Sequence, residues 1–478
     1  MQGMELWAII PELILATGIL ILLPVGSFLP RNRRSLNSWF ALIVLASAAV
    51  ATTRMLAWRP SAVFHGTYVV DPLAIFVKLL ALSATVLTLL ATESHFRGKA
   101  REAEVAPLLL LACLGVFGLA ASDDLALIAL FLQITTVASY ILVGIDKQNQ
   151  RSTEGALKFF LFSAAAGVVM LYGMALLYGL TGSLSLATIG ARLPGMPVVA
   201  SFVALALIFA GFGYKASIVP FHAWVPDAYQ GAAAPIAGFI SVAPKAAAFA
   251  VLLRTLVTAF PHARPFWSEA IAVIAAITMT VGNVAALRQS SAKRLVAWSS
   301  IAQAGYLLVG VAAAMRDALG VPALLFYLLV YVFMNLGAFV SIDALERTLG
   351  NDEIDSFSGA ARTLPLASAT LAVSALALAG FPPFGSFAAK SMLFGAALGG
   401  RQSWLAIVLA LNTALSLYYY VRLIQPLYFG TQSAGSNHNL PLALRFALIV
   451  FAAGSIITGV LPGAFVRFAA HSAQIISK

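Results

Sequence analysis

Two lysines, Lys215 and Lys245, lie inside long apolar stretches of the chain, and each has a proline close by, Pro220 and Pro244. A charge within the hydrocarbon of a membrane costs about 3 kcal/mol or more, and interrupted membrane helices are tolerated only against protein or water. Lysine suits proton transfer, because burial disfavours its charged form and lets it exchange a proton near neutral pH. The pattern predicts two successive broken helices that line an ion path.

Two further lysines belong to this candidate set. Lys390 follows the 382–383 proline pair by one to two helical turns, as expected of a group beside a broken helix. Lys158 follows Glu154 by four residues, which predicts a helix-stabilising ion pair as well as the start of a proton relay. Lys158, like Lys78, lies within about two turns of a helix end, so either side chain could instead extend to the membrane interface.

Other polar groups in the apolar segments suit different roles. Arg254 and Arg422 cannot release a proton, so we expect them to be anchors or structural partners. His222, beside Pro220, suits a relay role or an amphipathic core position. Gln133 lies about nine residues into the fifth apolar segment, whereas the acids of this part of the chain stand at segment ends. An amide at that depth can hydrogen-bond a lysine but cannot change its charge state as a carboxylate could.

The composition indicates a membrane protein. Of 478 residues, 61% are hydrophobic and only 10% are charged, a balance that ordinary soluble domains do not have. Fourteen apolar segments are each long enough to span a hydrocarbon core of about 30 Å. We therefore expect an all-α polytopic membrane protein with about fourteen transmembrane helices. The segments are 5–29, 36–57, 71–93, 105–121, 124–145, 154–180, 198–220, 232–259, 266–287, 292–314, 321–347, 364–389, 401–429 and 441–461.

The net charge of +11 indicates topology rather than nucleic-acid binding. Connections that follow odd-numbered segments, counted with the segment ends beside them, carry fourteen Lys and Arg residues, and those that follow even-numbered segments carry six. Basic residues concentrate in cytoplasmic loops. The first helix should thus begin on the outer face, and both termini should face that side.

Metal and nucleotide sites have little support. The single cysteine, Cys113, excludes a disulfide within the chain and any site with several cysteine ligands. The six histidines show no metal-ligand spacing, and no glycine-rich loop follows a strand. We expect no cofactor in this chain and no nucleic-acid partner.

Residues 105–262 and 263–432 are predicted to form two matched five-helix bundles. Each contains one proline-interrupted segment, IVPFHAWVP in the first and AGFPPFGSF in the second. A repeat with an odd number of helices must be inverted in the membrane, and inverted repeats with matched broken helices are typical of transport proteins. Residues 1–104 form a three-helix flank in this scheme, and 433–478 form a last helix and tail.

Several motifs resemble one known family. GYKASIVPFHAWVPDAYQGAAAPIAGFISVAPKAAAFA (213–250), SAKRLVAWSSIAQAGY (291–306), YVFMNLGAF (331–339) and LAGFPPFGSFAAK (378–390) are similar to the antiporter-like membrane subunits of respiratory complex I, the subunit N branch in particular. The resemblance implies a non-redox, proton-translocating subunit of a bacterial NADH:quinone oxidoreductase in the inner membrane. It also implies that FMN, iron–sulfur clusters and quinone bind to other subunits. The expected partners are lipid and other membrane-arm subunits, including small ones and another antiporter-like subunit.

The same resemblance assigns roles to the four lysines. Lys215 matches the central lysine of the first half-channel and Lys245 the connecting lysine. Lys390 matches the lysine beyond the second broken helix, and Lys158 matches the lysine of the sixth helix. These residues would relay protons in turn as quinone reduction elsewhere changes the local field.

The chain departs from the family pattern at three positions. Gln133 and Gln230 stand where the family usually has glutamate, and Gln303 stands where it usually has histidine. The carboxylate that would tune the central lysine is therefore missing. Two alternatives stay open on these grounds: a cation/proton antiporter subunit of the multi-subunit type, and a structural membrane-arm subunit that no longer pumps.

Overall fold

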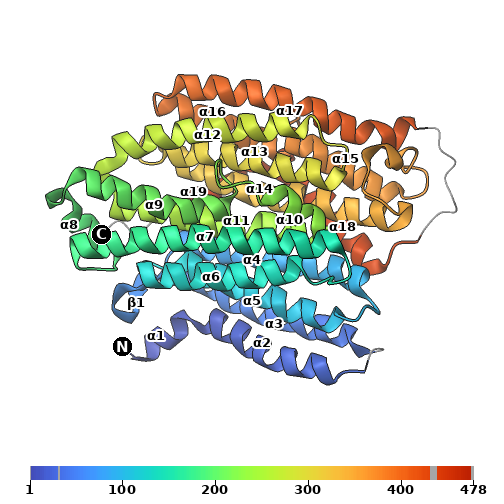
Figure 1. Ribbon diagram of the computed structural model, residues 1–478, viewed down its shortest axis with the longest axis horizontal. Coiled ribbons are helices and arrows are strands. Elements are labelled where there is room, and N and C mark those ends of the chain that lie inside the picture. Colours follow the sequence, from blue (N-terminus) through green and yellow to red (C-terminus); the bar gives the residue numbers. More distant parts are fainter. Residues whose placement is uncertain (1, 31–32, 431–438, 475–478) are drawn as a thin grey trace.

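The computed structural model describes all residues except 1, 31–32, 431–438 and 475–478, and it is almost entirely helical. The long helices lie side by side along the longest axis of the molecule (Figure 1). Within the described part of the chain, thirteen helices are long and apolar enough to cross a membrane, and Pro365–Ala379 is a shorter apolar helix. The prediction of an all-α polytopic membrane protein is confirmed.

The helix boundaries follow the predicted segments to within a few residues at most positions. The α-helices are α1 Gln2–Ala8, α2 Ile10–Phe28, α3 Ser35–Arg54, α4 Pro72–Phe96, α5 Glu102–Ala121, α6 Leu125–Val143, α7 Gln150–Thr181, α8 Leu186–Arg192, α9 Val198–Ala216, α10 Val225–Gly231, α11 Ala234–Ala259, α12 Arg264–Ala286, α13 Ala292–Ala313, α14 Gly320–Leu349, α15 Pro365–Ala379, α16 Gly385–Gly399, α17 Ser403–Phe429, α18 Leu442–Val460 and α19 Pro462–Ser472. A short antiparallel hairpin, β1 Ser61–Val63 and β2 Tyr68–Val70, lies between α3 and α4.

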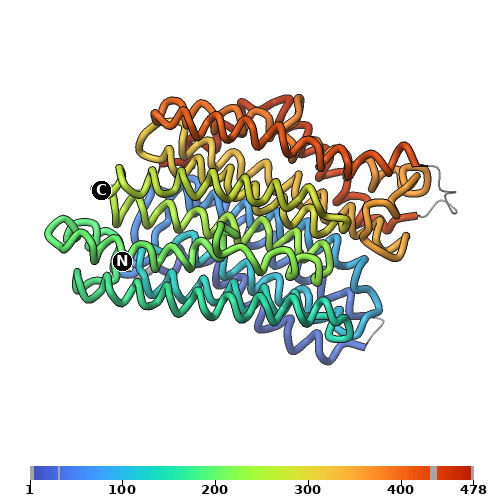
Figure 2. Tube along the Cα trace, turned by 45° about the horizontal axis from the view of Figure 1, so that its top comes forward, coloured from blue at the N-terminus to red at the C-terminus, as the bar shows by residue number. Residues whose placement is uncertain are grey.

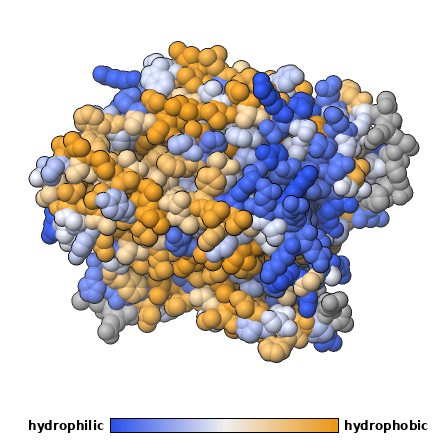
Figure 3. Space-filling model, viewed as in Figure 1, coloured by the Kyte–Doolittle hydropathy of each residue, from blue (hydrophilic) through white to orange (hydrophobic). Residues whose placement is uncertain are grey.

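The arrangement of polar and apolar surface suits a membrane. Apolar side chains cover most of the face seen in Figure 3, and hydrophilic residues gather toward the end where α10 and the start of α7 lie. Helices α11, α13 and α14 are buried among the others over most of their length. Both ends of the described chain lie at one end of the molecule (Figure 2), as the topology prediction requires of termini on the same side.

Two of the predicted breaks are present, and one is not. Helix α9 ends at Ala216 and the chain resumes a helix only at Val225, and α15 and α16 are separated around the 382–383 prolines. Helix α11, by contrast, continues through Pro244, so the expected break there was wrong. A proline removes one backbone hydrogen bond, and in a membrane helix neighbouring helices can hold the segment together. Here the whole apolar window of α11 is packed inside the protein.

A buried ion pair joins the start of α4 to α11. Asp71 caps α4 by accepting a hydrogen bond from the Ala74 amide at 2.8 Å, and the proline at the first helical position fits that cap. Its two oxygens also accept from Arg254 of α11 at 2.8 and 3.0 Å. Arg254 donates further to the Ala120 carbonyl at the end of α5. The prediction that Arg254 is a structural partner is confirmed.

Replacing Asp71 by asparagine should destabilise the fold strongly. The change keeps a capping oxygen but leaves the buried guanidinium of Arg254 without its charge partner, which typically costs about 3–5 kcal/mol. Thermal unfolding in detergent would measure the loss. Asp355→Asn, at an exposed acid, is the matched control and should change stability by less than about 0.5 kcal/mol. Equal melting of the two variants would contradict the structural role of the pair.

Asp123, in the loop before α6, should make stability depend on pH. Burial raises the pKa of its carboxyl to about 6 from an ordinary value of 3.8, although the nearby Arg254 opposes the change. Between about pH 4 and pH 6 the folded protein keeps this proton, whereas the unfolded chain has lost it. The contribution of Asp123 to the free energy of unfolding is therefore most favourable below about pH 4 and is lost as the pH rises to about 6. Asp123→Asn should therefore melt at a higher temperature than the native protein at pH 7.5, with a smaller difference at pH 4.5. A difference that is the same at both pH values would contradict this assignment.

Candidate functional site

Lys215 is the last-turn lysine of α9, directly before the first helix break. Its Nζ donates to the Thr136 hydroxyl of α6 at 3.1 Å and lies 5.8 Å from the centre of the Phe159 ring. The side chain is almost fully buried. Within the described chain, no carboxylate forms an ion pair with it, so its contacts are a neutral hydroxyl and an aromatic face. A hydroxyl and an aromatic ring can bind the ammonium group, but they favour its charged form less than a carboxylate would.

Aromatic packing holds the first break in place. Trp224, the last residue of the break, stacks on Phe159 with ring centres 4.1 Å apart, and its indole N–H donates to the Tyr214 carbonyl at 3.3 Å. The Tyr214 hydroxyl in turn donates to the Phe159 carbonyl at 3.1 Å. These contacts tie the end of α9 to α7, so that Lys215 has a fixed neighbourhood despite the interruption.

Lys245 lies in the middle of α11 and is 0% exposed. Its Nζ donates to Ser300 of α13 twice, at 2.8 Å to the carbonyl and at 2.6 Å to the hydroxyl. Tyr331 of α14 donates to the same hydroxyl at 2.9 Å. Lys245 thus sits at the junction of three buried helices with only neutral partners.

Lys390 belongs to α16 and reaches back to the end of α15 across the second break. Its Nζ donates to the carbonyls of Leu378 and Ala379, both at 3.0 Å, and lies 4.5 Å from the centre of the Tyr306 ring. A cation is favoured at this helix C-terminus, where carbonyls lack helical partners. Gly380 ends α15 with φ +87°, and a side chain there would crowd Lys390.

Gln303 of α13 shares a partner with Lys390. Its Nε2 donates to the Leu378 carbonyl and to the Tyr420 hydroxyl, both at 3.1 Å, and its oxygen accepts from Tyr327. Three hydrogen bonds fix the amide, which cannot ionise. Gln303 stands at the position where a histidine was expected. It is a neutral side chain that hydrogen-bonds the Leu378 carbonyl and the two tyrosine hydroxyls.

Helix α13 connects the second and third lysines. Ser300, the partner of Lys245, and Gln303, which shares a carbonyl with Lys390, are three residues apart and therefore neighbours on one helix face. Ser299 extends the polar cluster through its contact with the Tyr420 hydroxyl at 2.5 Å. The structure thus brings the surroundings of Lys245 and Lys390 together, whereas Lys215 bonds to Thr136 of α6.

Lys158 is in a different setting. It forms ion pairs with Glu154 at 2.6 Å, as the spacing predicts, and with Asp227 of α10 at 2.7 Å. Arg294 donates to the other oxygen of Asp227 and to Gln230. Burial alone would raise the pKa of Asp227, but Lys158 and Arg294 hold it below its usual range. The side chain of Lys158 is 37% exposed, so it lies in a surface ion network and not in direct contact with Lys215.

His222 and Gln133 are near the first break but make no hydrogen bond to its lysine in the described part of the chain. His222 packs edge-on against Trp298 at 5.6 Å, and its Nδ1 is buried without a partner. Gln133 is half-buried on α6, with its amide nitrogen facing Gly167 of α7. It lies one turn from Thr136, the partner of Lys215. Their relay roles stay predictions.

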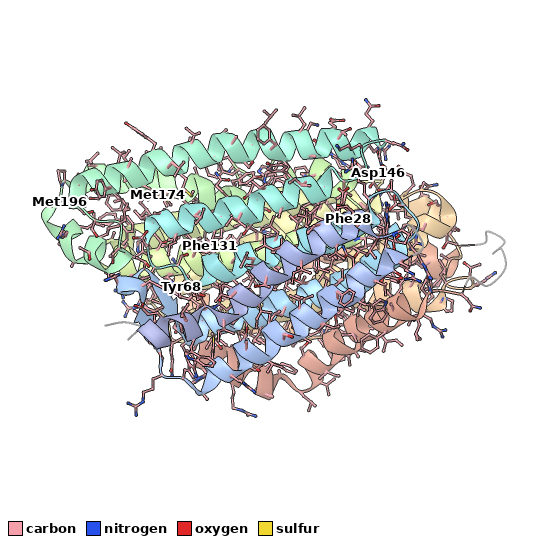
Figure 4. The ribbon with its side chains drawn as sticks, turned by 90° about the horizontal axis from the view of Figure 1, so that it is seen from below. Phe28, Tyr68, Phe131, Asp146, Met174 and Met196 are labelled. Carbon is pink, nitrogen blue, oxygen red and sulfur yellow. The ribbon has the colours of Figure 1, made fainter. Side chains whose placement is uncertain are left out.

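Lys78 corrects an expectation from the sequence. It does not extend to the interface but is buried, with Glu12 of α2 at 2.7 Å and the Tyr68 hydroxyl at 2.8 Å. Tyr68 lies at the end of the molecule opposite Phe28 and Asp146 (Figure 4). Glu12 neutralises the lysine, which is why it can stay inside. The sequence offered one signal for this pair, because Glu12 is a charged residue inside the first apolar segment.

Comparisons with known proteins agree with the motifs. The family model described as "NADH:quinone oxidoreductase/Mrp antiporter, TM" matches residues 122–416. The chain belongs to this family. NADH-quinone oxidoreductase subunit N of Trichlorobacter lovleyi is 37% identical over 99% of this chain and 98% of that protein. F(420)H(2) dehydrogenase subunit N of Methanosarcina mazei is 33% identical over 99% of both chains.

Solved structures give the same picture. A chain of respiratory complex I from Thermus thermophilus is 33% identical, with a TM-score of 0.81 over 96% of this chain and 100% of that chain. A chain of the Mrp complex from Dietzia sp. is 22% identical with a TM-score of 0.88 over 98% and 97% of the two chains, which shows a shared fold. The chain is therefore a multi-pass antiporter-like membrane protein, homologous to a subunit of an enzyme complex, and the predicted resemblance is confirmed.

Proposed function

We propose that this chain translocates protons as a non-redox membrane subunit of an NADH:quinone oxidoreductase. The observation that carries the proposal is the set of three buried lysines, Lys215, Lys245 and Lys390, whose hydrogen-bond partners are all neutral. A buried lysine without an acid to hold its proton can exist in either charge state. Electron transfer would occur on FMN, iron–sulfur clusters and quinone in other subunits.

The partners of each lysine suit both of its charge states. A hydroxyl such as that of Thr136 or Ser300 can accept a hydrogen bond from an ammonium or donate one to a neutral amine. A neutral amine also keeps two N–H groups, so Lys390 can donate to both of its carbonyls before and after it gives up a proton. Proton transfer at these sites therefore needs no large rearrangement of the surrounding helices.

The proposal also covers the role of Lys158, the membrane in which the protein lies and the side that its termini face. Lys158 and Asp227 would take part at the hydrophilic end, where protons arrive from the cytoplasm. The protein would lie in a bacterial inner membrane with both termini outside. Its partners would be small membrane subunits and another antiporter-like subunit of the same membrane arm. The relative from Thermus thermophilus supports a membrane complex as the setting, because it is a chain of respiratory complex I.

Donor-driven acidification of inverted membrane vesicles tests this proposal. The native complex is compared with Lys215→Met at matched complex abundance, and the internal pH is followed during NADH oxidation. A smaller gradient per NADH oxidised supports proton translocation through this chain. Sodium-dependent transport without NADH would instead favour an antiporter.

A scaffold role is the second candidate, and Gln133 is the observation that favours it. Gln133 offers no carboxylate at this position of α6. A subunit that only completes the membrane arm would keep its helix packing while its lysines lose their role. An unchanged gradient in Lys215→Met would support this candidate.

A further inference from the structure

A buried pair outside the lysine series joins α4 to α14. His95, in the last turn of α4, has its Nδ1 2.6 Å from Oδ1 of Asp343. Asp343 is 0% exposed, whereas the His95 side chain is 16% exposed. The other oxygen of Asp343 is buried without a hydrogen-bond partner, and Arg347 lies 3.8 Å away from it. His95 is thus partly open to solvent, whereas Asp343 lies in the protein interior.

Helix α14 carries polar groups from this pair inward to Lys245. Asn335 donates to the Ser241 hydroxyl of α11 at 2.5 Å, and Tyr331 donates to Ser300, the partner of Lys245. At 1.5 Å per residue, Asn335 lies about 12 Å along the helix from Asp343, and Tyr331 about 6 Å further.

Buried polar atoms without partners mark the interval between them. In the described chain, the side-chain oxygens Asn335 Oδ1, Ser341 Oγ and Asp343 Oδ2 on α14 have no hydrogen-bond partner, and all three residues are fully buried. Buried polar groups in proteins are nearly always satisfied, by protein or by ordered water. Asn335 and Asp343 lie within about 80° of each other around α14, whereas Ser341 faces the other side of the helix. The unpartnered oxygens of Asn335 and Asp343 therefore point to a hydrated segment between these two residues.

We propose that the His95–Asp343 pair is a proton-loading site that supplies Lys245 along α14. The proposal rests on the proposed function. His95 takes a proton from the aqueous phase at the end of the molecule that carries the basic loops. The proton passes through Asp343 and bound water to the neutral amine of Lys245, which becomes an ammonium, and His95 returns to its neutral form.

The charges around the pair fit transient loading. Arg347 of α14 faces the free oxygen of Asp343 and also donates to Ser94 of α4 at 3.1 Å. Lys293 of α13 is paired with Glu346 at 2.9 Å. Arg347 thus balances Asp343 when His95 is neutral, and both charge states of His95 can exist without an isolated buried carboxylate.

The competing interpretation is a purely structural bridge between the flank and α14. Such a bridge would be lost in Asp343→Asn, and the complex would become less abundant without any change in protons moved per NADH oxidised. His95→Asn separates the two roles, because an asparagine amide can occupy the position of Nδ1 and still donate to Asp343 but cannot take up a proton.

The test measures vesicle acidification per NADH oxidised in His95→Asn, Asp343→Asn and Asp343→Glu complexes. Thr92→Val is the matched control, since Thr92 is buried one turn before His95 and bonds only to its own helix. We expect loss of acidification in the first two variants, partial recovery in Asp343→Glu and no change in the control. Native acidification per NADH in both His95→Asn and Asp343→Asn would overturn the proposal, whatever their abundance. If Lys245→Met also acidified normally, the proposed function itself would be wrong.

Discussion

Replacement of Lys215 by methionine is expected to lower the proton gradient built per NADH oxidised, by the share that passes through this chain, while leaving the complex assembled. Methionine matches the length of the lysine stem but carries no exchangeable proton. A positioned proton-transfer group typically contributes about 10²–10⁴-fold to a rate. At the low end of that range, translocation through this chain would fall below detection in vesicles.

Assembly should survive because of the partners that Lys215 has. Its hydrogen-bond partner, Thr136, is neutral, so the substitution leaves no buried charge unpaired. The opposite holds for Arg254, whose removal would strand the buried carboxylate of Asp71. Among the buried cations, those with neutral partners should therefore affect transport, and those with acid partners should affect stability.

The control for Lys215→Met is Lys99→Met. Lys99 is an exposed lysine in the loop after α4, so this variant removes the same charge from the chain without touching the helix breaks. Acidification and abundance should both stay at the native level. If Lys215→Met also keeps the native gradient per NADH oxidised, the buried lysines do not carry protons in this chain.

Much of the fold could be predicted because hydropathy reports directly on membrane burial. The start of α9 at Val198 and the interruption near Pro220 agree with the predicted segment. Pro244 was misjudged because a sequence does not show how tightly neighbours pack around a proline. Helix α19 was missed because it is short and carries polar residues, so it has no membrane-spanning signal. The division into two inverted five-helix bundles stays a prediction.

The candidate site could be predicted only in part. The lysines are visible in the sequence because a charge in an apolar segment is rare. Their partners are not, because Lys245 and Ser300 are 55 positions apart and His95 and Asp343 are 248 apart. Lys78 shows the consequence: without its partner Glu12 in view, a location at the interface was the simpler interpretation.

Replacement of Gln133 by glutamate is expected to raise the steepest proton gradient that the vesicles sustain. Gln133 lies one turn from Thr136 on α6, so a carboxylate there would face Lys215 through its hydroxyl partner. At about 8 Å and an effective dielectric constant of 20, the attraction is about 2 kcal/mol. An attraction of this size, switched on and off as the carboxylate approaches and leaves Lys215, widens the free-energy difference between the protonated and neutral lysine. Transport can then work against a larger gradient.

Gln133→Leu and the double variant Gln133→Glu/Lys215→Met distinguish the cause. Leucine fills the same half-buried position without charge, so it should not raise the gradient. The double variant should lose the gain, because the carboxylate acts only through Lys215, and non-additivity of this kind is the signature of a direct interaction. A gain that persists without Lys215 would instead mean that the glutamate opens a separate path. No gain in the single variant would contradict the prediction and mean that a carboxylate at this position adds nothing to the coupling of Lys215.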